Sequence, residues 1–298
     1  MKNEASITSL MSAFGRAYHS ANENNPIFDD YEARSLISDE EYEAIGNYIL
    51  GGIDFFAPEK KGVFNNDEEA LAYLVNTQIA PTPLARAKYC ESALKTAMLT
   101  GTQQYVILGA GLDTFALREP DFANVFEVDH PLTQKDKAKR IIKAKGKIPD
   151  NLIFTAVDFS KDNLKEKLIS AGFDTKKKSF FSLLGVSFYL TKEQIESTLE
   201  SIADLCSDGS TLVFDYADEG LFTSSVKRVR NMIAMAAAGG EEMKSCFSYN
   251  ELEKLLEKHG FLIYELLTSP DIQSSFFDGH GGNLTAFEHI NYVTAVCK

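Results

Sequence analysis

From residue 105 onward, short β-rich runs alternate with charged segments of helical character. Repeated alternation of this kind predicts a parallel sheet with helices on both faces, because each helix serves as the crossover between two strands. The five runs are 105–108, 125–128, 152–157, 179–184 and 211–216. The pattern predicts an α/β fold with a Rossmann-like sheet, and the 298 residues suffice to bury its core.

Two further strand-like runs, 261–268 and 289–297, close the sequence, with about twenty residues of no helical pattern between them. We expect them to form an antiparallel pair, so that the last strand of a mostly parallel sheet runs against the others.

Helix start signals recur along the chain. Ser38 precedes Glu41 by three positions, the spacing of a capping box, and Thr191 and Ser248 stand in the same relation to Gln194 and Glu251. Each pair predicts a helix that begins at the next residue. After the third helix comes Gly260, a residue type that favours a helix end.

These signals predict an arrangement in three parts. Residues 1–100 have the pattern of an N-terminal helical extension or lid, and residues 101–298 that of the Rossmann-like core. Within the core, the segment at about 218–247 is rich in Ala, Gly and Met and interrupts the alternation. We expect it to form a helical cap over the carboxyl edge of the sheet, so that all parts make one catalytic unit.

Composition excludes several classes of partner. The chain has 43 acidic and 30 basic residues, a net charge of −13, which argues against a nucleic-acid partner because phosphate recognition needs a basic surface. The sequence contains no run of about 18 apolar residues, the length that would predict a membrane span. The four cysteines have neither a C-x-x-C pair nor metal-ligand spacing, so we expect no metal and a reduced, cytoplasmic location.

The first β-rich run leads into a glycine turn. Gly109 permits a tight turn, and Gly111 lets a ligand approach the backbone closely. The third glycine of the dinucleotide fingerprint is absent, since Thr114 stands in its place. Taken alone, the motif is a weak signal for a ligand-binding turn, and a tight turn that binds no ligand is the alternative.

Acidic residues end the next two runs. Asp129 lies twenty residues after Gly109, where a carboxylate can accept hydrogen bonds from both hydroxyls of a ribose. Asp158 could accept a hydrogen bond from an adenine amino group while Phe159 covers the ring. The alternatives are a solvated strand end for Asp129, a helix cap for Asp158 and a core position for Phe159.

Together these motifs resemble the leucine carboxyl methyltransferase family and its bacterial O-methyltransferase relatives. The resemblance rests on 109–114, 126–129, 157–159 and 184–190, and upstream on 16–19, 27–30 and 85–94. It covers nearly the whole chain, and the ordered set is far more specific than any single motif.

The resemblance implies a methyltransferase that uses S-adenosylmethionine and releases S-adenosylhomocysteine. It implies that Arg86 binds the methionine carboxylate, Gly109, Ala110 and Gly111 approach the cofactor with their backbone, Asp129 binds the ribose, and Asp158 and Phe159 bind the adenine. Many relatives have Glu where this chain has Leu184, so Leu184 is expected to contribute only backbone or packing.

Methyl transfer from a sulfonium requires mainly that the acceptor be held in line, about 3–3.5 Å from the methyl carbon. A carboxylate acceptor arrives ionised, whereas a hydroxyl must lose its proton to a base. The candidates after the fourth, fifth and sixth runs are Tyr189, Tyr216 and His280, of which His280 is the best base. The alternative for His280 is an exposed loop residue without a role in catalysis.

The sequence therefore predicts an O-methyltransferase acting on a carboxylate or hydroxyl, with a small molecule favoured over a protein C-terminal carboxylate. Two other interpretations stay open, an NAD-dependent oxidoreductase and a non-catalytic nucleotide-binding protein. The oligomeric state is not predicted.

Overall fold

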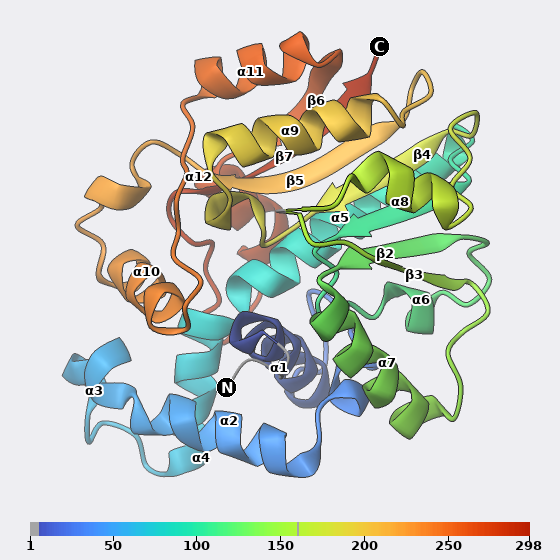
Figure 1. The fold of residues 1–298 in the computed structure, drawn as a ribbon. Helices are drawn as coiled ribbons and strands as arrows, with labels where there is room; N and C mark the ends of the chain where they lie inside the picture. Colours follow the sequence, from blue (N-terminus) through green and yellow to red (C-terminus); the bar gives the residue numbers. More distant parts are fainter. Residues whose placement is uncertain (1–5, 160) are drawn as a thin grey trace.

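The computed structural model describes residues 6–159 and 161–298. Within them lies a seven-stranded sheet in the order β3-β2-β1-β4-β5-β7-β6 (Figure 1). Strands β1 to β5 pair in parallel, and β7 is antiparallel to both of its neighbours. The strands are β1 (Gln104–Leu108), β2 (Val125–Asp129), β3 (Leu152–Ala156), β4 (Ser179–Leu183), β5 (Thr211–Ala217), β6 (Phe261–Leu267) and β7 (Ile290–Cys297). The predicted α/β class is confirmed, including the parallel majority and the antiparallel end.

The antiparallel end has one feature that the sequence prediction missed. The link between β6 and β7 contains the helix α12 (Ser269–Ile272) and a π-helical turn, Gln273–Phe277, so the expectation of a link without helix was wrong. A capping box explains the helix, because Thr268 and Asp271 exchange hydrogen bonds at its start. The acid in this box is Asp instead of the usual Glu or Gln, which concealed the signal.

The other helices cover the two faces of the sheet or lie apart from the strands and pack on other helices (Figure 1). They are α1 (Ile7–Asn22), α2 (Asp39–Gly51), α3 (Ile53–Phe56), α4 (Asp67–Leu74), α5 (Pro81–Leu99), α6 (Phe115–Arg118), α7 (Pro131–Lys145), α8 (Leu164–Ser170), α9 (Lys192–Ala203), α10 (Lys227–Ala238) and α11 (Tyr249–Lys258). All three predicted capping boxes form, at the starts of α2, α9 and α11. Gly260 follows α11 with a φ of +80°, a backbone conformation that favours glycine.

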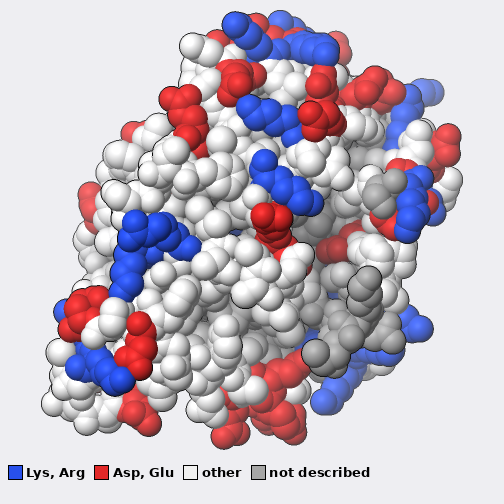
Figure 2. Space-filling view, turned by 60° about the vertical axis from the view of Figure 1, so that its left-hand side comes forward, with Lys and Arg blue, Asp and Glu red and all other residues white. Residues whose placement is uncertain are grey.

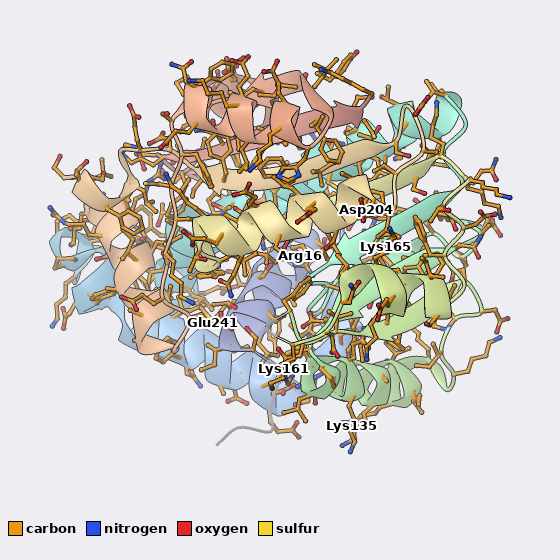
Figure 3. All side chains as sticks on the ribbon, turned by 45° about the horizontal axis from the view of Figure 1, so that its top comes forward. Arg16, Lys135, Lys161, Lys165, Asp204 and Glu241 are labelled. Atoms are coloured by element: carbon orange, nitrogen blue, oxygen red, sulfur yellow. The ribbon has the colours of Figure 1, made fainter. Side chains whose placement is uncertain are left out.

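Strand β1 demonstrates why the core has two halves. Tyr105 and Ile107 pack into one apolar cluster with α1 and α5, while Val106 and Leu108 pack into a second with α8, α9 and α11. Successive side chains of a strand point to opposite faces, so a strand buried on both sides needs apolar residues at every position. On the outside of the second layer, Lys165 and Asp204 join α8 to the end of α9 at 2.9 Å (Figure 3).

The helices before β1 and the helix α10 stand where the extension and the cap were expected. The division at residue 100 and the treatment of 218–247 as a cap remain predictions about domain organisation. None of the helices in the described part of the chain combines the length and the apolar character that crossing a bilayer requires.

Candidate active site

A cavity of about 820 Å³ opens at the carboxyl ends of the parallel strands. This is the edge at which open α/β sheets bind ligands, because the loops there diverge on either side of the first strand. Figure 2 shows the surface hollowed near its centre, with acidic and basic side chains around the opening. The structure brings all eight predicted cofactor residues to the lining of this cavity, namely Arg86, Gly109, Ala110, Gly111, Asp129, Asp158, Phe159 and Leu184.

The glycine turn after β1 depends on glycine for conformation and for space. Gly109 and Gly111 have φ values of +70° and +49°. A Cβ on Gly109 would lie 2.4 Å from Val186, and one on Gly111 would lie 2.1 Å from the Ser9 hydroxyl on α1. The turn therefore exposes backbone to the cavity at a point where no side chain fits.

Asp129, at the end of β2, binds this turn directly. One carboxylate oxygen accepts a hydrogen bond from the Gly111 amide and the other from the His130 amide, both at 2.6 Å. Burial raises the pKa of Asp129, and these two amide donors act in the opposite direction. Each carboxylate oxygen can accept a second hydrogen bond, so the group can still receive the two hydroxyls of a ribose.

Asp158 and Phe159 follow β3 and line the same cavity. The Asp158 carboxylate accepts a hydrogen bond from the Lys161 ammonium at 2.8 Å. The alternative in which Asp158 caps the following helix is wrong, because Asn163 is the residue that caps α8. An acid and an aromatic ring thus stand beside the end of β3, at the position expected for an adenine site.

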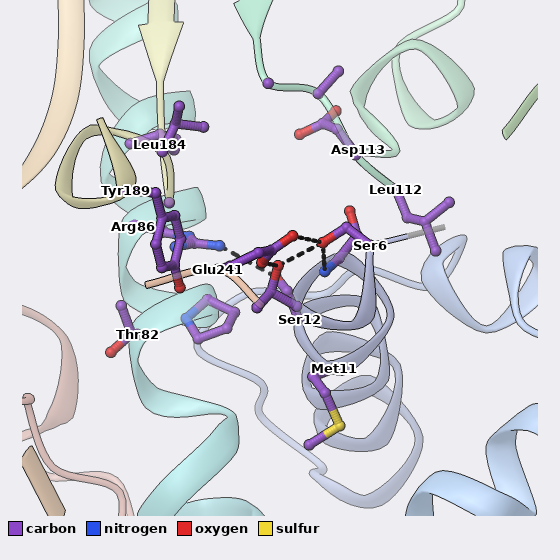
Figure 4. Close-up of a pocket in the computed structure, with 18 of the residues that line it drawn as sticks. Ser6, Met11, Ser12, Thr82, Arg86, Leu112, Asp113, Leu184, Tyr189 and Glu241 are labelled. Carbon is purple, nitrogen blue, oxygen red and sulfur yellow. Dashed lines mark hydrogen bonds between the residues drawn. The ribbon is translucent and has the colours of Figure 1, made fainter. Parts of the chain in front are cut away.

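Arg86 extends from α5 toward the turn after β4, as Figure 4 shows. Its guanidinium lies 3.4 Å from the Asp215 carboxylate and donates a hydrogen bond to the Ser12 hydroxyl at 3.3 Å. A Cβ on Gly185, which has a φ of +70°, would lie 2.4 Å from the guanidinium. The turn and the arginine are therefore packed without space for a further side chain.

Asp215 is a site residue that the sequence prediction missed. It is fully buried on β5, and it accepts a hydrogen bond from the Gly185 amide at 2.7 Å while it faces Arg86. Burial raises the pKa of Asp215, and the Arg86 charge opposes that effect. The signal that could have identified it in the sequence is an acidic residue inside the otherwise apolar run 211–216. Because Leu184 is apolar, Asp215 is the carboxylate that meets Arg86 here.

A second group of residues that the sequence did not predict joins α1 to the segment after α10. The Ser6 hydroxyl donates a hydrogen bond to the Glu241 carboxylate at 2.6 Å, and the Thr8 hydroxyl donates another. In Figure 4, Glu241 lies between α1 and the side of the cavity that carries Arg86 and Tyr189. These hydroxyls and the acid are 233 or more residues apart in sequence, so no local pattern indicates the contact.

The three catalytic candidates lie in different surroundings. Tyr189 lines the cavity, and burial raises its pKa to about 12. Tyr216 is buried in the apolar cluster beneath α9 and α11. His280 is exposed in the loop before β7 and is not among the described residues that line the cavity. Of the three, only Tyr189 lines the cavity together with the predicted cofactor residues, because the Tyr216 side chain points from β5 into the apolar cluster and His280 is exposed to solvent.

A further histidine, His19, is buried near the end of α1. Its Nε2 accepts a hydrogen bond from the Ile27 amide at 3.0 Å. Burial lowers the pKa of His19 to about 4, with the nearby charge of His280 as the second cause. The imidazole therefore stays neutral in the folded protein near pH 7 and holds α1 to the loop that follows it.

This burial predicts a pH-dependent stability. Between about pH 6.5 and pH 4 the unfolded chain binds a proton on His19 and the folded protein does not, so the free energy of unfolding falls as pH drops through this window. We expect His19→Gln, which keeps an acceptor for Ile27, to reduce that fall. Urea denaturation near pH 7 and near pH 5 measures it. An equal fall in both proteins would contradict the assignment.

Comparison with known proteins agrees with the geometry. The family model for leucine carboxyl methyltransferase matches residues 9–203. YktD of Bacillus subtilis, provisionally named an S-adenosyl-L-methionine-dependent methyltransferase, is 48% identical over 303 residues, which cover 100% of this chain and 99% of that protein. A Mycobacterium marinum protein with the same provisional description is 30% identical over 221 residues, covering 72% of this chain and 67% of that protein.

Among solved structures, a Thermobifida fusca YX protein provisionally described as a methyltransferase has a TM-score of 0.55. The two chains are 14% identical, and the match covers 100% of this chain and 96% of that chain. This likeness shows the fold. The family match supports neither the nicotinamide oxidoreductase nor the non-catalytic interpretation. The chain belongs to the leucine carboxyl methyltransferase family and is an S-adenosylmethionine-dependent methyltransferase.

Proposed function

We propose that this enzyme methylates a carboxylate oxygen of a small molecule. The observation that carries the proposal is the position of Tyr189, the one of the three catalytic candidates that lines the cavity, beside Arg86. With a pKa raised to about 12, the phenol keeps its proton at neutral pH and cannot act as a general base. An acceptor that arrives already ionised, such as a carboxylate, needs no base.

The rest of the lining is consistent with this proposal. His130 is an imidazole in the cavity, but its Nδ1 accepts the Leu132 amide at 3.3 Å at the start of α7, beside Asp129. Glu241 is bound by Ser6 and Thr8. His130 therefore lies beside the proposed ribose site, and Glu241 is held at the start of α1.

The residues present fit S-adenosylmethionine, which supplies an electrophilic methyl group on a sulfonium when bound. Asp129 would accept the ribose hydroxyls, Arg86 would bind the carboxylate of the methionine part, and the turn from Gly109 to Gly111 would contact it through the backbone. Asp158 and Phe159 would bind the adenine. What remains for the protein is to hold the acceptor oxygen in line and to exclude water.

The test of the function is the chemistry of the product. Incubation with methyl-labelled S-adenosylmethionine and matched pairs of carboxylic acids and alcohols should give label in methyl esters. Mild alkali releases labelled methanol from an ester and leaves an ether intact. Label that is stable to alkali, found with hydroxyl acceptors alone, would contradict the proposal.

A phenol that keeps its proton can donate a hydrogen bond, and we propose that the Tyr189 hydroxyl donates one to the acceptor carboxylate. This role predicts the effect of removing the hydroxyl. Tyr189→Phe should lower the transfer rate by roughly threefold to tenfold, the value of one hydrogen bond to the acceptor. The shape of the pH–rate profile should not change, because the phenol does not titrate in the working range. Initial rates from about pH 6 to pH 9 measure both.

The matched control for this substitution is Tyr216→Phe, which removes a buried hydroxyl away from the cavity and should leave the rate unchanged. His280→Ala should also leave it unchanged, since the imidazole is exposed outside the cavity lining. A lower rate in His280→Ala with normal cofactor affinity would restore His280 as the base and would contradict our assignment.

A further inference from the structure

The wall of the cavity formed by α3, α10 and neighbouring segments is apolar. It contains side chains from α3, from the turn before α5, from α5, from α10 and from the segment before β7, namely Phe56, Ile79, Pro83, Met232, Met235 and Phe287. Methionine side chains are flexible and adapt to the shape of an apolar ligand. Arg228 on α10 also lines this part of the cavity, and its guanidinium donates hydrogen bonds to Glu288 at 2.7 Å and Thr285 at 2.6 Å.

A second hollow lies on the outer side of this wall. This groove, of about 370 Å³, is lined by Asn47, Tyr48, Gly51, Gly52, Phe55, Phe56 and Met235. It contains no charged side chain among the residues that line it, and Tyr48 and Phe55 are 65% and 44% exposed. Exposed aromatic residues grouped at a hollow indicate a surface that binds an apolar partner.

Cavity and groove share two of their lining residues, Phe56 and Met235. These side chains form the partition between the two spaces. Of the two, Met235 is the flexible one, and its thioether chain can change rotamer without a shift of the backbone. The backbone around them is held in place, because the Asn231 amide on α10 donates a hydrogen bond to the Phe55 carbonyl at 3.2 Å. Movement of these two side chains would open an apolar passage from the cavity to the surface between α3 and α10.

We propose that the acceptor is a carboxylate with an apolar chain, and that the chain passes between Phe56 and Met235 into the groove on α2 and α3. The inference rests on the proposed carboxylate methylation and specifies its substrate class. Its carboxylate would be held at the cofactor, and its chain would cover Tyr48 and Phe55. The continuity of apolar lining from cavity to groove favours such an occupant over a polar acceptor or a protein surface.

Gly51 provides a variant that blocks only the groove. A Cβ on Gly51 meets nothing within 4 Å, and the residue ends α2 without a positive φ, so Gly51→Phe can fill the groove without strain. The matched control is Gly281→Phe, since Gly281 is equally open and lies in the loop before β7, outside the groove. Neither position lines the cavity.

The experiment measures both binding and transfer with hexanoate and dodecanoate. Calorimetry on the full chain saturated with S-adenosylhomocysteine should give at least about a hundredfold tighter binding of dodecanoate, since each buried methylene improves affinity roughly fourfold. Gly51→Phe should weaken dodecanoate binding about tenfold or more and leave hexanoate unchanged. Gly281→Phe should behave as wild type in both.

The possible results separate this inference from the proposed function. Equal binding of the two acids, or no effect of Gly51→Phe, would contradict binding of the chain in the groove. Neither result would bear on whether the enzyme forms methyl esters. Chain-dependent binding that Gly51→Phe abolishes, without any methyl ester formed, would support the groove and refute carboxylate methylation. Methylation of hydroxyl acceptors alone, with no binding of either acid, would overturn both.

Discussion

An Asp129→Ala variant is expected to bind S-adenosylmethionine at least about a hundredfold more weakly than the wild type. Two hydrogen bonds to a charged acceptor contribute at least about 3 kcal/mol in total, and each 1.4 kcal/mol is a factor of ten. Asp129 also accepts the Gly111 amide at 2.6 Å, so its removal loosens the turn that contacts the cofactor. Affinity and turn geometry should therefore be lost together.

Asp129→Asn separates the two effects, because an amide oxygen can still accept the Gly111 hydrogen bond but lacks the charge. We expect its affinity to fall between those of the wild type and Asp129→Ala. Asp150→Ala removes an exposed acid after α7 and serves as the control for net charge. Calorimetry with S-adenosylmethionine gives the dissociation constants, and thermal melting checks folding. A loss of less than about threefold in Asp129→Ala would remove Asp129 from the cofactor site.

A Lys137→Met variant is expected to lose about 3–5 kcal/mol of stability. Lys137 on α7 and Glu127 on β2 are each 1% exposed, and their charged atoms lie 2.5 Å apart. Burial raises the pKa of Glu127 to about 7, and the Lys137 charge acts in the opposite direction. Without Lys137, the fold must bury either an unpaired carboxylate or a carboxyl that has been protonated at a cost.

The loss of stability in Lys137→Met should depend on pH. Because the pKa of Glu127 is raised in the folded state, the folded protein keeps a proton that the unfolded chain has lost between about pH 4.5 and pH 7. The contribution of Glu127 to stability therefore falls as pH rises through this window. Lys137→Met raises that pKa further, so the variant should be most destabilised at alkaline pH and should recover as pH falls.

Chemical denaturation near pH 5 and near pH 8 measures this dependence. The double variant Glu127→Gln with Lys137→Met should recover much of the loss, since it buries no charge. Lys147→Met breaks an exposed pair with Asp150 and should cost less than about 1 kcal/mol. A pH-independent loss in Lys137→Met would show that packing, not the unpaired acid, causes the destabilisation.

The convergence of the predicted cofactor residues on one cavity was predictable because their signals are local. The glycine turn, Asp129 and the pair Asp158 and Phe159 each follow a strand directly, and parallel strands place their carboxyl ends along one edge. Once the alternation of strands and helices predicts a parallel sheet, these residues must come close together. Arg86 was predicted by family resemblance, since nothing in its own helix indicates a ligand.

Other contacts around the cavity join segments that are distant in sequence. Asp215 reaches Arg86 across 129 positions, and Ser6 reaches Glu241 across 235. Tyr216 lies within β5, where the strand face turns its side chain into the apolar cluster. Whether Tyr189 or His280 faces the cavity is decided by how the loops after β4 and β6 turn, and loop direction has no signal in residue spacing. For the same reason, nothing in the sequence relates α3 to α10.

By itself, the sequence determined the sheet, the capped helices and the position of the cofactor motifs, because backbone hydrogen bonding and side-chain alternation act over a few residues. Only the tertiary structure decided that Tyr189 lies at the cavity while His280 lies outside it, and that Phe56 and Met235 divide the cavity from a groove. Those relations arise from the packing of α1, α3, α5 and α10 against one another. Packing depends on the shapes of surfaces that are remote in sequence, which no local pattern records.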